Sequence, residues 1–316
     1  MATKKTTSTT TKSTSKKEKV KIPPLPQEIK VDIKDLLGKL TADVKKSVHN
    51  LDRQEARYLV DLYYQMQHFR IQADNQTRIL TEEDAKVSRV AIQCMAEMYK
   101  KQEAYCNDLL TEYAKSQPIG RWLKSITGIA GTLSAGLIAH IDIKKCETAG
   151  AIWRYAGLDP TVVWEKGQKR PWNAKLKTLC WKIGQSFIKV SNNPKDIYGK
   201  IYKQRKEWEI QQNESGAYAE FAAQQLKNKK YGKDTQAYKA YIQGKLPDAH
   251  ITARAARYAV KIFLSHLFDV WYELDRGKKP PKPFAIGILG HAHMIDPPMP
   301  DDFMAIKDDL EHLDIA

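Results

Sequence analysis

A run of small residues interrupts an apolar stretch at Ser125 to Ile141, which reads SITGIAGTLSAGLIAHI. A short helical approach, Arg121 to Lys124, leads into it, and a second helix follows whose apolar residues face inward, namely Leu133, Leu137, Ile138 and Ile141. A turn of small residues lets backbone N–H groups come close to a phosphate, and the N-terminus of the next helix adds partial positive charge. The spacing therefore predicts a phosphate-binding, helix-hairpin-helix-like element. The alternative is that Gly128, Gly131 and Gly136 only permit close helix packing.

The sequence around this turn is strongly basic. The chain of 316 residues has 52 Lys and Arg against 37 Asp and Glu, a net charge of +15. Between Lys115 and Ile210 there are 18 Lys and Arg against 7 Asp and Glu, a local surplus of 11 positive charges. Such a field favours a polyanionic partner. We expect phosphate contacts from Lys124, Thr127, Gly128, Ile129, Ala130, Gly131, Thr132, Lys144, Lys145, Arg154, Lys169, Arg170, Lys175 and Lys177.

The polyanion is expected to be nucleic acid rather than a membrane surface. The longest apolar candidate, around Ile126 to Ile143, contains Gly, Thr, His and Asp and falls short of the roughly 20 residues that a spanning helix needs. Met1 to Lys21 is rich in Thr, Ser and Lys and lacks the apolar core of a signal peptide. The sequence therefore predicts a cytoplasmic protein. Because phosphate contacts carry no base information, its binding should depend on salt and tolerate many sequences.

Two further motifs follow the turn in order. Tyr155 to Pro160 reads Y-A-G-L-D-P, and Gly167 to Lys177 is a basic stretch, GQKRPWNAKLK. Together with the turn, they resemble the carboxy-terminal domain of the insertion-sequence 110 family of transposases. The resemblance covers residues 123 to 192 and continues loosely through the helix at 254 to 274. It implies a DNA-binding protein of a mobile element or phage that acts in DNA transposition or recombination.

The chain departs from that family where the family carries out catalysis. The family begins with a RuvC-like nuclease domain bearing four acidic metal ligands, whereas residues 1 to 50 here are a basic tail and one short segment, Ile29 to Leu40, with no room for that domain. The family's nucleophilic serine corresponds to positions occupied by Trp164, Glu165, Lys166 and Gly167, and none of these is a hydroxyl nucleophile. Ala130 also replaces the second glycine of the usual turn, and Ser134 an alanine. We therefore expect no catalytic residue, no cofactor and no metal.

Two alternatives remain open. A divergent, active transposase or recombinase could use an unrecognised nucleophile, or a partner subunit could supply the missing domain. The protein could instead be an RNA-binding accessory, because the related transposases work with a guide RNA.

Other residues whose types could do chemistry have blander explanations. His291, His293 and Asp296 are close enough in sequence to suggest a metal site, but loop residues with this spacing more often lie on the surface or pack. Ser186 and Ser191 are expected to be helix and cap residues. A set of aromatic residues interleaved with Lys and Arg could stack on unpaired bases, although core packing is the expectation for Trp164, Trp172, Trp181, Tyr198, Tyr202 and Trp208.

The elements that must position these residues are helices. Residues 28–117 predict a long antiparallel, coiled-coil-like hairpin, with one helix from Asp52 to about Leu80, an N-cap at Thr81 and a second helix running to about Gln117. It either packs within the chain or forms a homodimer. Residues 118–276 predict the helical DNA-binding domain, which ends in an amphipathic helix from Ala249 to Asp275. The expected fold is mostly α, with a disordered basic arm at 1–27 and a Pro-rich, then acidic, tail at 277–316.

Overall fold

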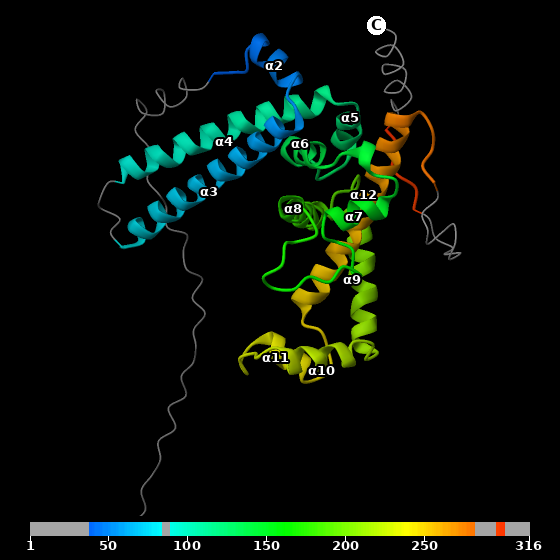
Figure 1. The fold of residues 1–316 in the computed structure, drawn as a ribbon. Coiled ribbons are helices and arrows are strands. Elements are labelled where there is room, and N and C mark those ends of the chain that lie inside the picture. Colours follow the sequence, from blue (N-terminus) through cyan, green and yellow to red (C-terminus); the bar gives the residue numbers. More distant parts are fainter. Residues whose placement is uncertain (1–37, 84–88, 282–294, 301–316) are drawn as a thin grey trace, which may run out of the picture. The chain divides into compact units, whose positions relative to one another are not determined.

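The computed structural model describes residues 38–83, 89–281 and 295–300 (Figure 1). The expectations for the basic arm, for His291 and His293 and for the acidic end of the tail lie outside these residues. Within the described ranges the chain forms eleven α-helices and one short 3-10 helix and contains no strand, which confirms a mostly α protein. The described residues divide into two compact units, one within residues 64–103 and the other formed by residues 39–63 and the described residues from Ala104 onward.

The long antiparallel hairpin is present. It consists of α3 (Arg53–Glu83) and α4 (Val90–Ser116). In the unit that holds their distal halves, the rings of Phe69 and Tyr99 lie 5.4 Å apart, and the carboxylate of Glu103 accepts hydrogen bonds from Gln67 (2.9 Å) and Arg70. The three- and four-residue spacing of apolar residues therefore predicted both helices and their pairing correctly.

The predicted N-cap at Thr81 is wrong. Thr81 lies inside α3, where its buried hydroxyl donates to the carbonyl of Thr77 at 2.7 Å, and α4 begins only at Val90. A threonine hydroxyl can bond either to an N–H at the start of a helix or to the carbonyl four residues before it within a helix. No Gly or Pro near Thr81 ends α3, so the second arrangement prevails.

The other unit begins with α2 (Ala42–His49) and contains the base of the hairpin. Nine further α-helical and 3-10 segments follow α4 in the described part of the chain: α5 (Pro118–Ser125), α6 (Gly131–His140), η1 (Ile143–Lys145), α7 (Ala149–Tyr155), α8 (Ala174–Val190), α9 (Tyr198–Glu214), α10 (Ala219–Asn228), α11 (Gln236–Tyr241) and α12 (Asp248–Arg276). Among these described residues, no helix is both long and apolar enough to cross a membrane.

Helix α12 is the centre of this unit and contacts α5, η1, α7, α8 and α9 (Figure 1). Its Phe263 stacks on Trp122 at 6.0 Å between ring centroids and meets the rings of Phe187 and Tyr198 edge-on at 5.5 and 5.2 Å. All four side chains are fully buried, so they join α5, α8, α9 and α12 in one core. The predicted amphipathic helix is confirmed, since one side of it is buried, and Gly277 ends the helix in the left-handed conformation.

Candidate nucleic-acid interface

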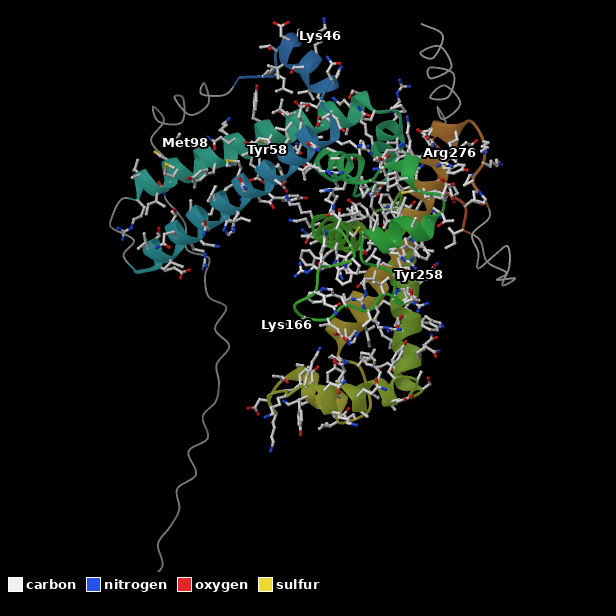
Figure 2. The ribbon with its side chains drawn as sticks, in the orientation of Figure 1. Lys46, Tyr58, Met98, Lys166, Tyr258 and Arg276 are labelled. Atoms are coloured by element: carbon white, nitrogen blue, oxygen red, sulfur yellow. The ribbon has the colours of Figure 1, made fainter. Side chains whose placement is uncertain are left out.

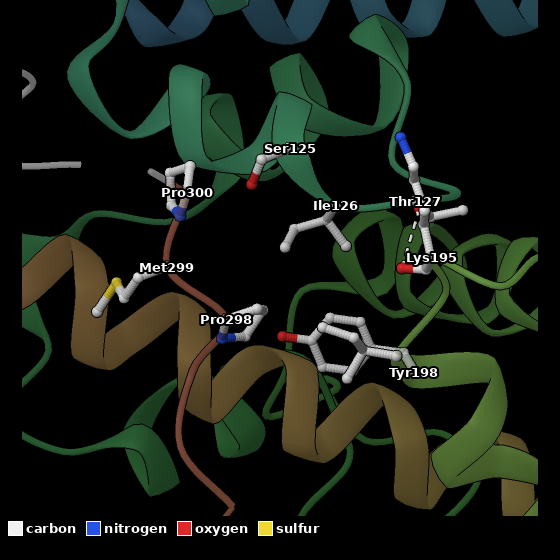
Figure 3. A pocket seen from close by; sticks show the side chains of 9 residues that line it. Ser125, Ile126, Thr127, Lys195, Tyr198, Pro298, Met299 and Pro300 are labelled. Carbon is white, nitrogen blue, oxygen red and sulfur yellow. Dashed lines mark hydrogen bonds between the residues drawn. The ribbon is translucent and has the colours of Figure 1, made fainter. Parts of the chain in front are cut away.

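The turn between α5 and α6 is held in place by neighbouring elements. Gly128 has φ +92°, a conformation that glycine adopts without strain, and its carbonyl accepts a hydrogen bond from the Ser186 hydroxyl of α8 at 2.6 Å. The hydroxyl of Thr127 reaches the carbonyl of Lys195 at 3.5 Å (Figure 3). The segment at 298–300 lines a pocket beside this turn, and its Pro298 carbonyl accepts a hydrogen bond from Trp122 at 2.7 Å. The turn is thus a fixed structure.

Two glycines of the turn region allow close packing. A Cβ on Gly131 would lie 2.0 Å from Oγ1 and 2.8 Å from Cα of Thr111 on α4, and one on Gly136 would lie 2.8 Å from Leu179 of α8. Neither position can hold a larger residue without movement of its neighbour. Gly131 and Gly136 therefore do permit close helix packing, whether or not the turn also binds phosphate.

Only part of the turn is accessible to a ligand. The side chains of Ile129 and Thr132 are buried, and Thr132 donates to Asn107 at 2.8 Å. Ala130 is exposed and is the N-cap residue of α6, with a backbone in the extended region and no side-chain hydrogen bond to the helix. A ligand would reach this turn through Ala130, Thr127 and backbone atoms.

Several of the predicted basic residues have carboxylate partners. Lys175 pairs with Asp61 of α3, Arg154 with Asp159 at 3.2 Å, and Lys145 lies 3.8 Å from Asp142. The remaining basic residues predicted to contact phosphate are found at the end of α5, on η1, in the loop before α8 and in the first turn of α8, namely Lys124, Lys144, Lys169, Arg170 and Lys177.

The loop between α7 and α8 is built around two tryptophans, and Lys166 projects from it in Figure 2. The Trp172 ring lies 2.8 Å from where a Cβ of Gly157 would be, and Gly157 has φ +65°. The Trp164 ring meets Trp172 edge-on at 6.2 Å, and the guanidinium of Arg170 lies 5.4 Å from the centre of the Trp164 ring. The loop ends at Asn173, whose side chain accepts from the backbone N–H of Leu176 at 3.0 Å and caps α8.

Next to this loop, α8 and α12 form a basic and aromatic surface to which the loop adds Arg170. We call it the α8–α12 face and define it as Arg170, Lys177, Trp181 and Arg257. Lys177, Trp181 and Arg257 line a cavity of about 170 Å³ whose other walls include Ala256 and Val260. Trp181 is 64% exposed, and the ammonium of Lys177 lies 4.1 Å from the centre of the Trp172 ring. Cations, open aromatic surface and a hollow thus occur together.

The electrostatics of the α8–α12 face are those of like charges brought together. Partial burial and then the positive charges of Arg257 and Arg170 lower the pKa of Lys177. Burial and then the neighbouring Arg254 likewise lower the pKa of Arg257, against a smaller opposing effect of the Glu209 carboxylate. Within the described residues none of the three cations of the face forms an ion pair with a carboxylate. A bound anion would relieve this repulsion.

The turn and the α8–α12 face are separate surfaces. Ser186, which anchors the turn, follows Lys177 by nine residues, and at about 3.6 residues per turn these two positions lie on opposite sides of α8. The sequence groups them because both lie in the basic stretch from Lys115 to Ile210. The structure brings Lys177 together instead with Arg257 of α12, a residue that was not among the predicted contacts.

The core expectation for the aromatic residues is correct for Tyr198 and Tyr202 but wrong for Trp181 and Trp208. Helix α8 buries Leu176, Cys180, Ile183 and Phe187 on one side, and Trp181 lies off that stripe. The apolar spacing of α8 therefore already indicated that Trp181 lies outside the core. Trp208 is 43% exposed and is covered on one side by the guanidinium of Arg205, 3.9 Å from its ring centre.

The two serines have structural roles, as expected. Ser186 donates to the turn, and Ser191 is the C-cap residue of α8. Within the described residues no group of three or more His, Cys, Asp or Glu side chains could hold a metal ion. Comparison of the chain with protein-family models, with curated proteins and with solved structures found no match.

Proposed function

We propose that the protein binds DNA through its phosphate backbone, with the α8–α12 face as the main contact surface. The observation that carries the proposal is that Lys177 lines one cavity with Arg257 and lies within the field of Arg170, while none of the three cations has a carboxylate partner in the described part of the chain. Binding through such a cluster releases counterions from DNA and tolerates sequence change. The net charge of +15 acts in the same direction.

The biological setting of this binding rests on the family resemblance. A DNA-binding protein of the transposase type would act in transposition or recombination, and the departures at Trp164 to Gly167 favour a role without an intrinsic nuclease. The turn between α5 and α6 would then serve as a second, helix-hairpin-helix-like contact through its backbone and Ala130. Incubation with supercoiled plasmid and Mg²⁺ tests whether the protein lacks an intrinsic nuclease. Nicking that a single substitution abolishes would indicate an active recombinase.

The main test is a filter-binding titration of a duplex across salt concentrations. We expect affinity to fall steeply with salt, and the slope of log affinity against log salt to decrease by about one for each of Lys177→Gln and Arg257→Gln. Lys189→Gln is the matched control, because Lys189 is an exposed cation of the same helix outside the α8–α12 face. Affinity that hardly changes with salt, or an equal loss in the control, would contradict the proposal.

The exposed Trp181 favours an unpaired strand as a second candidate ligand. Stacking of a base on an aromatic ring contributes about 1 to 3 kcal/mol and requires the base to be accessible. If the ligand is a single strand, Trp181→Ala should weaken its binding about tenfold or more while leaving duplex binding nearly unchanged. Competition between duplex DNA, single-stranded DNA and structured RNA separates these cases and also tests the RNA-binding alternative.

A further inference from the structure

A second and larger cavity lies where the start of α3 meets η1, α7 and the end of α6. Its volume is about 490 Å³, which is in the range of sites for small organic ligands. The side chains that give it a chemical character are Arg53, Arg57, His140, Asp142, Lys145 and Tyr155. All of them belong to the same compact unit, and none belongs to the α8–α12 face.

The charged groups of this cavity do not balance. Arg53 binds Asp142 at 2.8 Å, and the hydrogen bond from Arg53 holds the pKa of that carboxyl below its usual value, so Asp142 is ionised at neutral pH. Burial and then the positive charge of Arg57 lower the pKa of His140 to about 4, so the imidazole is neutral. Among the side chains that line the cavity, three cations, Arg53, Arg57 and Lys145, thus face one carboxylate, which leaves two positive charges uncompensated. The nearby carboxylate of Asp61 is already paired with Lys175. This balance matches a dianion.

The hydrogen-bond donors of the cavity fit the same ligand. Nε of Arg57 donates to the carbonyl of Ala139 at 2.8 Å, which fixes the guanidinium and leaves its two terminal amino groups to donate elsewhere. The hydroxyl oxygen of Tyr155 accepts from Asn173 at 2.9 Å, so its own hydrogen is free to be donated. Lys145 is 82% exposed at the side chain and adds an accessible cation. Arginine, lysine and hydroxyl donors around one space are the groups that bind phosphate oxygens.

We propose that this cavity binds a phosphomonoester dianion. A phosphodiester of the DNA backbone carries one negative charge, whereas a terminal phosphate carries close to two at neutral pH and so matches the surplus of the cavity. Two kinds of molecule supply such a group, a free nucleotide and a nucleic-acid strand with a phosphorylated 5′ end. The site is independent of the proposed DNA contact on the α8–α12 face, so either can fail without the other.

Isothermal titration calorimetry of the full chain tests the proposal with inorganic phosphate, a nucleoside 5′-monophosphate and two short strands that differ only in a 5′-phosphate. We expect saturable phosphate binding that sodium chloride of equal ionic strength does not reproduce. Lys145→Gln should weaken it about tenfold, whereas Lys144→Gln, a change at the neighbouring exposed lysine that does not line the cavity, should change it less than about twofold. Arg57→Lys, which keeps the charge but removes the fork of donors, should also weaken it.

The two sources of the phosphate give different results. Tight binding of the nucleotide with no difference between the two strands assigns the site to a free nucleotide, and a preference for the phosphorylated strand that is lost in Lys145→Gln assigns it to a strand end. Because the Lys145 side chain is largely exposed, its replacement leaves the fold intact, and equal melting temperatures of the two lysine variants check this. Absence of saturable phosphate binding at millimolar concentration, or equal weakening by both lysine substitutions, would overturn the proposal.

Discussion

Two arginines one turn apart on α12 have opposite surroundings. Arg254 donates from Nε to the carboxylate of Glu209 at 2.7 Å. Burial by itself would lower the pKa of Arg254, but this hydrogen bond, the charge of Glu209 and the contact with Tyr218 together raise it. Arg257 has no carboxylate partner in the described chain and lies near Lys177, and its pKa is lowered. The sequence presents both as basic residues on the outer side of one amphipathic helix.

The difference comes from a single buried carboxylate. Glu209 is 1% exposed, and its two oxygens accept from Arg254, from Arg205 at 2.9 Å and from the hydroxyl of Tyr218. Burial by itself would raise the pKa of Glu209, but these hydrogen bonds lower it on balance. Arg254 therefore joins α9 to α12, whereas Arg257 is left for a ligand. A basic residue whose donors are held by a buried carboxylate is a poorer candidate for phosphate binding than one with donors to spare.

Removal of that carboxylate should have the largest effect. Glu209→Gln leaves Arg205 and Arg254 close together without their counter-charge, and we expect the free energy of unfolding to fall by about 4 kcal/mol. Urea denaturation measures this change. Glu207→Gln, at an exposed residue of the same helix, should change stability by less than about 0.5 kcal/mol. Equal stability of the two variants would mean that Glu209 is not the cause of the difference between Arg254 and Arg257.

The pH dependence of stability tests the same contrast at His140, a buried imidazole close to the cation Arg57. His140 is 4% exposed, and burial followed by the charge of Arg57, with a smaller effect of Lys175 and an opposing one of Asp61, lowers its pKa to about 4. Because the unfolded chain binds the proton more tightly, stability is complete above about pH 6.5 and is lost as the pH falls towards 4, by up to about 3 kcal/mol.

The variant His140→Gln isolates this contribution. Burial also lowers the pKa of His250 and His266, so the wild-type chain has several groups that act in the same direction. The difference in unfolding free energy between wild type and His140→Gln should shrink between pH 6.5 and pH 4, and denaturation at a series of pH values measures it. A difference that stays constant over this interval would show that folding does not lower the pKa of His140.

The two arginines themselves should separate stability from binding. Arg254→Gln should lower the free energy of unfolding by about 2 kcal/mol, because the buried carboxylate of Glu209 then loses one of its two arginine partners. Arg257→Gln should leave stability within about 0.5 kcal/mol and weaken duplex binding about fivefold at low salt. Thermal unfolding of both variants measures stability, and filter binding measures their affinity for the duplex. If Arg257→Gln destabilises as much as Arg254→Gln, the contrast between the two residues is wrong.

The smallest expected effect concerns the turn. Helix α8 is capped by Asn173, whereas Ala130 at the start of α6 offers no cap, so Ala130→Ser should stabilise the protein by about 1 kcal/mol. Ala130→Asp should stabilise it similarly but place a negative charge where phosphate would bind. If the turn contacts DNA, the aspartate variant binds more weakly than the serine variant in filter binding. Equal binding by the two variants would restrict the DNA contact to the α8–α12 face.

The sequence determined the helices of this protein because a helix depends on residues three and four positions apart. That spacing predicted the hairpin of α3 and α4 and the amphipathic α12, and the predicted ends near Gln117 and at Asp275 lie within one residue of the observed ends. Local spacing failed at Thr81, where a hydroxyl satisfies two different local structures.

Only the tertiary structure decided which basic residues remain available. Lys175 is taken by Asp61, 114 positions earlier, and Arg254 by Glu209, 45 positions earlier. Packing also placed the turn and Lys177 on opposite sides of α8. It brought Arg257 of α12 into the same cavity as Lys177. The charge of a side chain is fixed by its chemical type, but its partner is fixed by the helices that pack against it, and the spacing within one helix carries no information about the next.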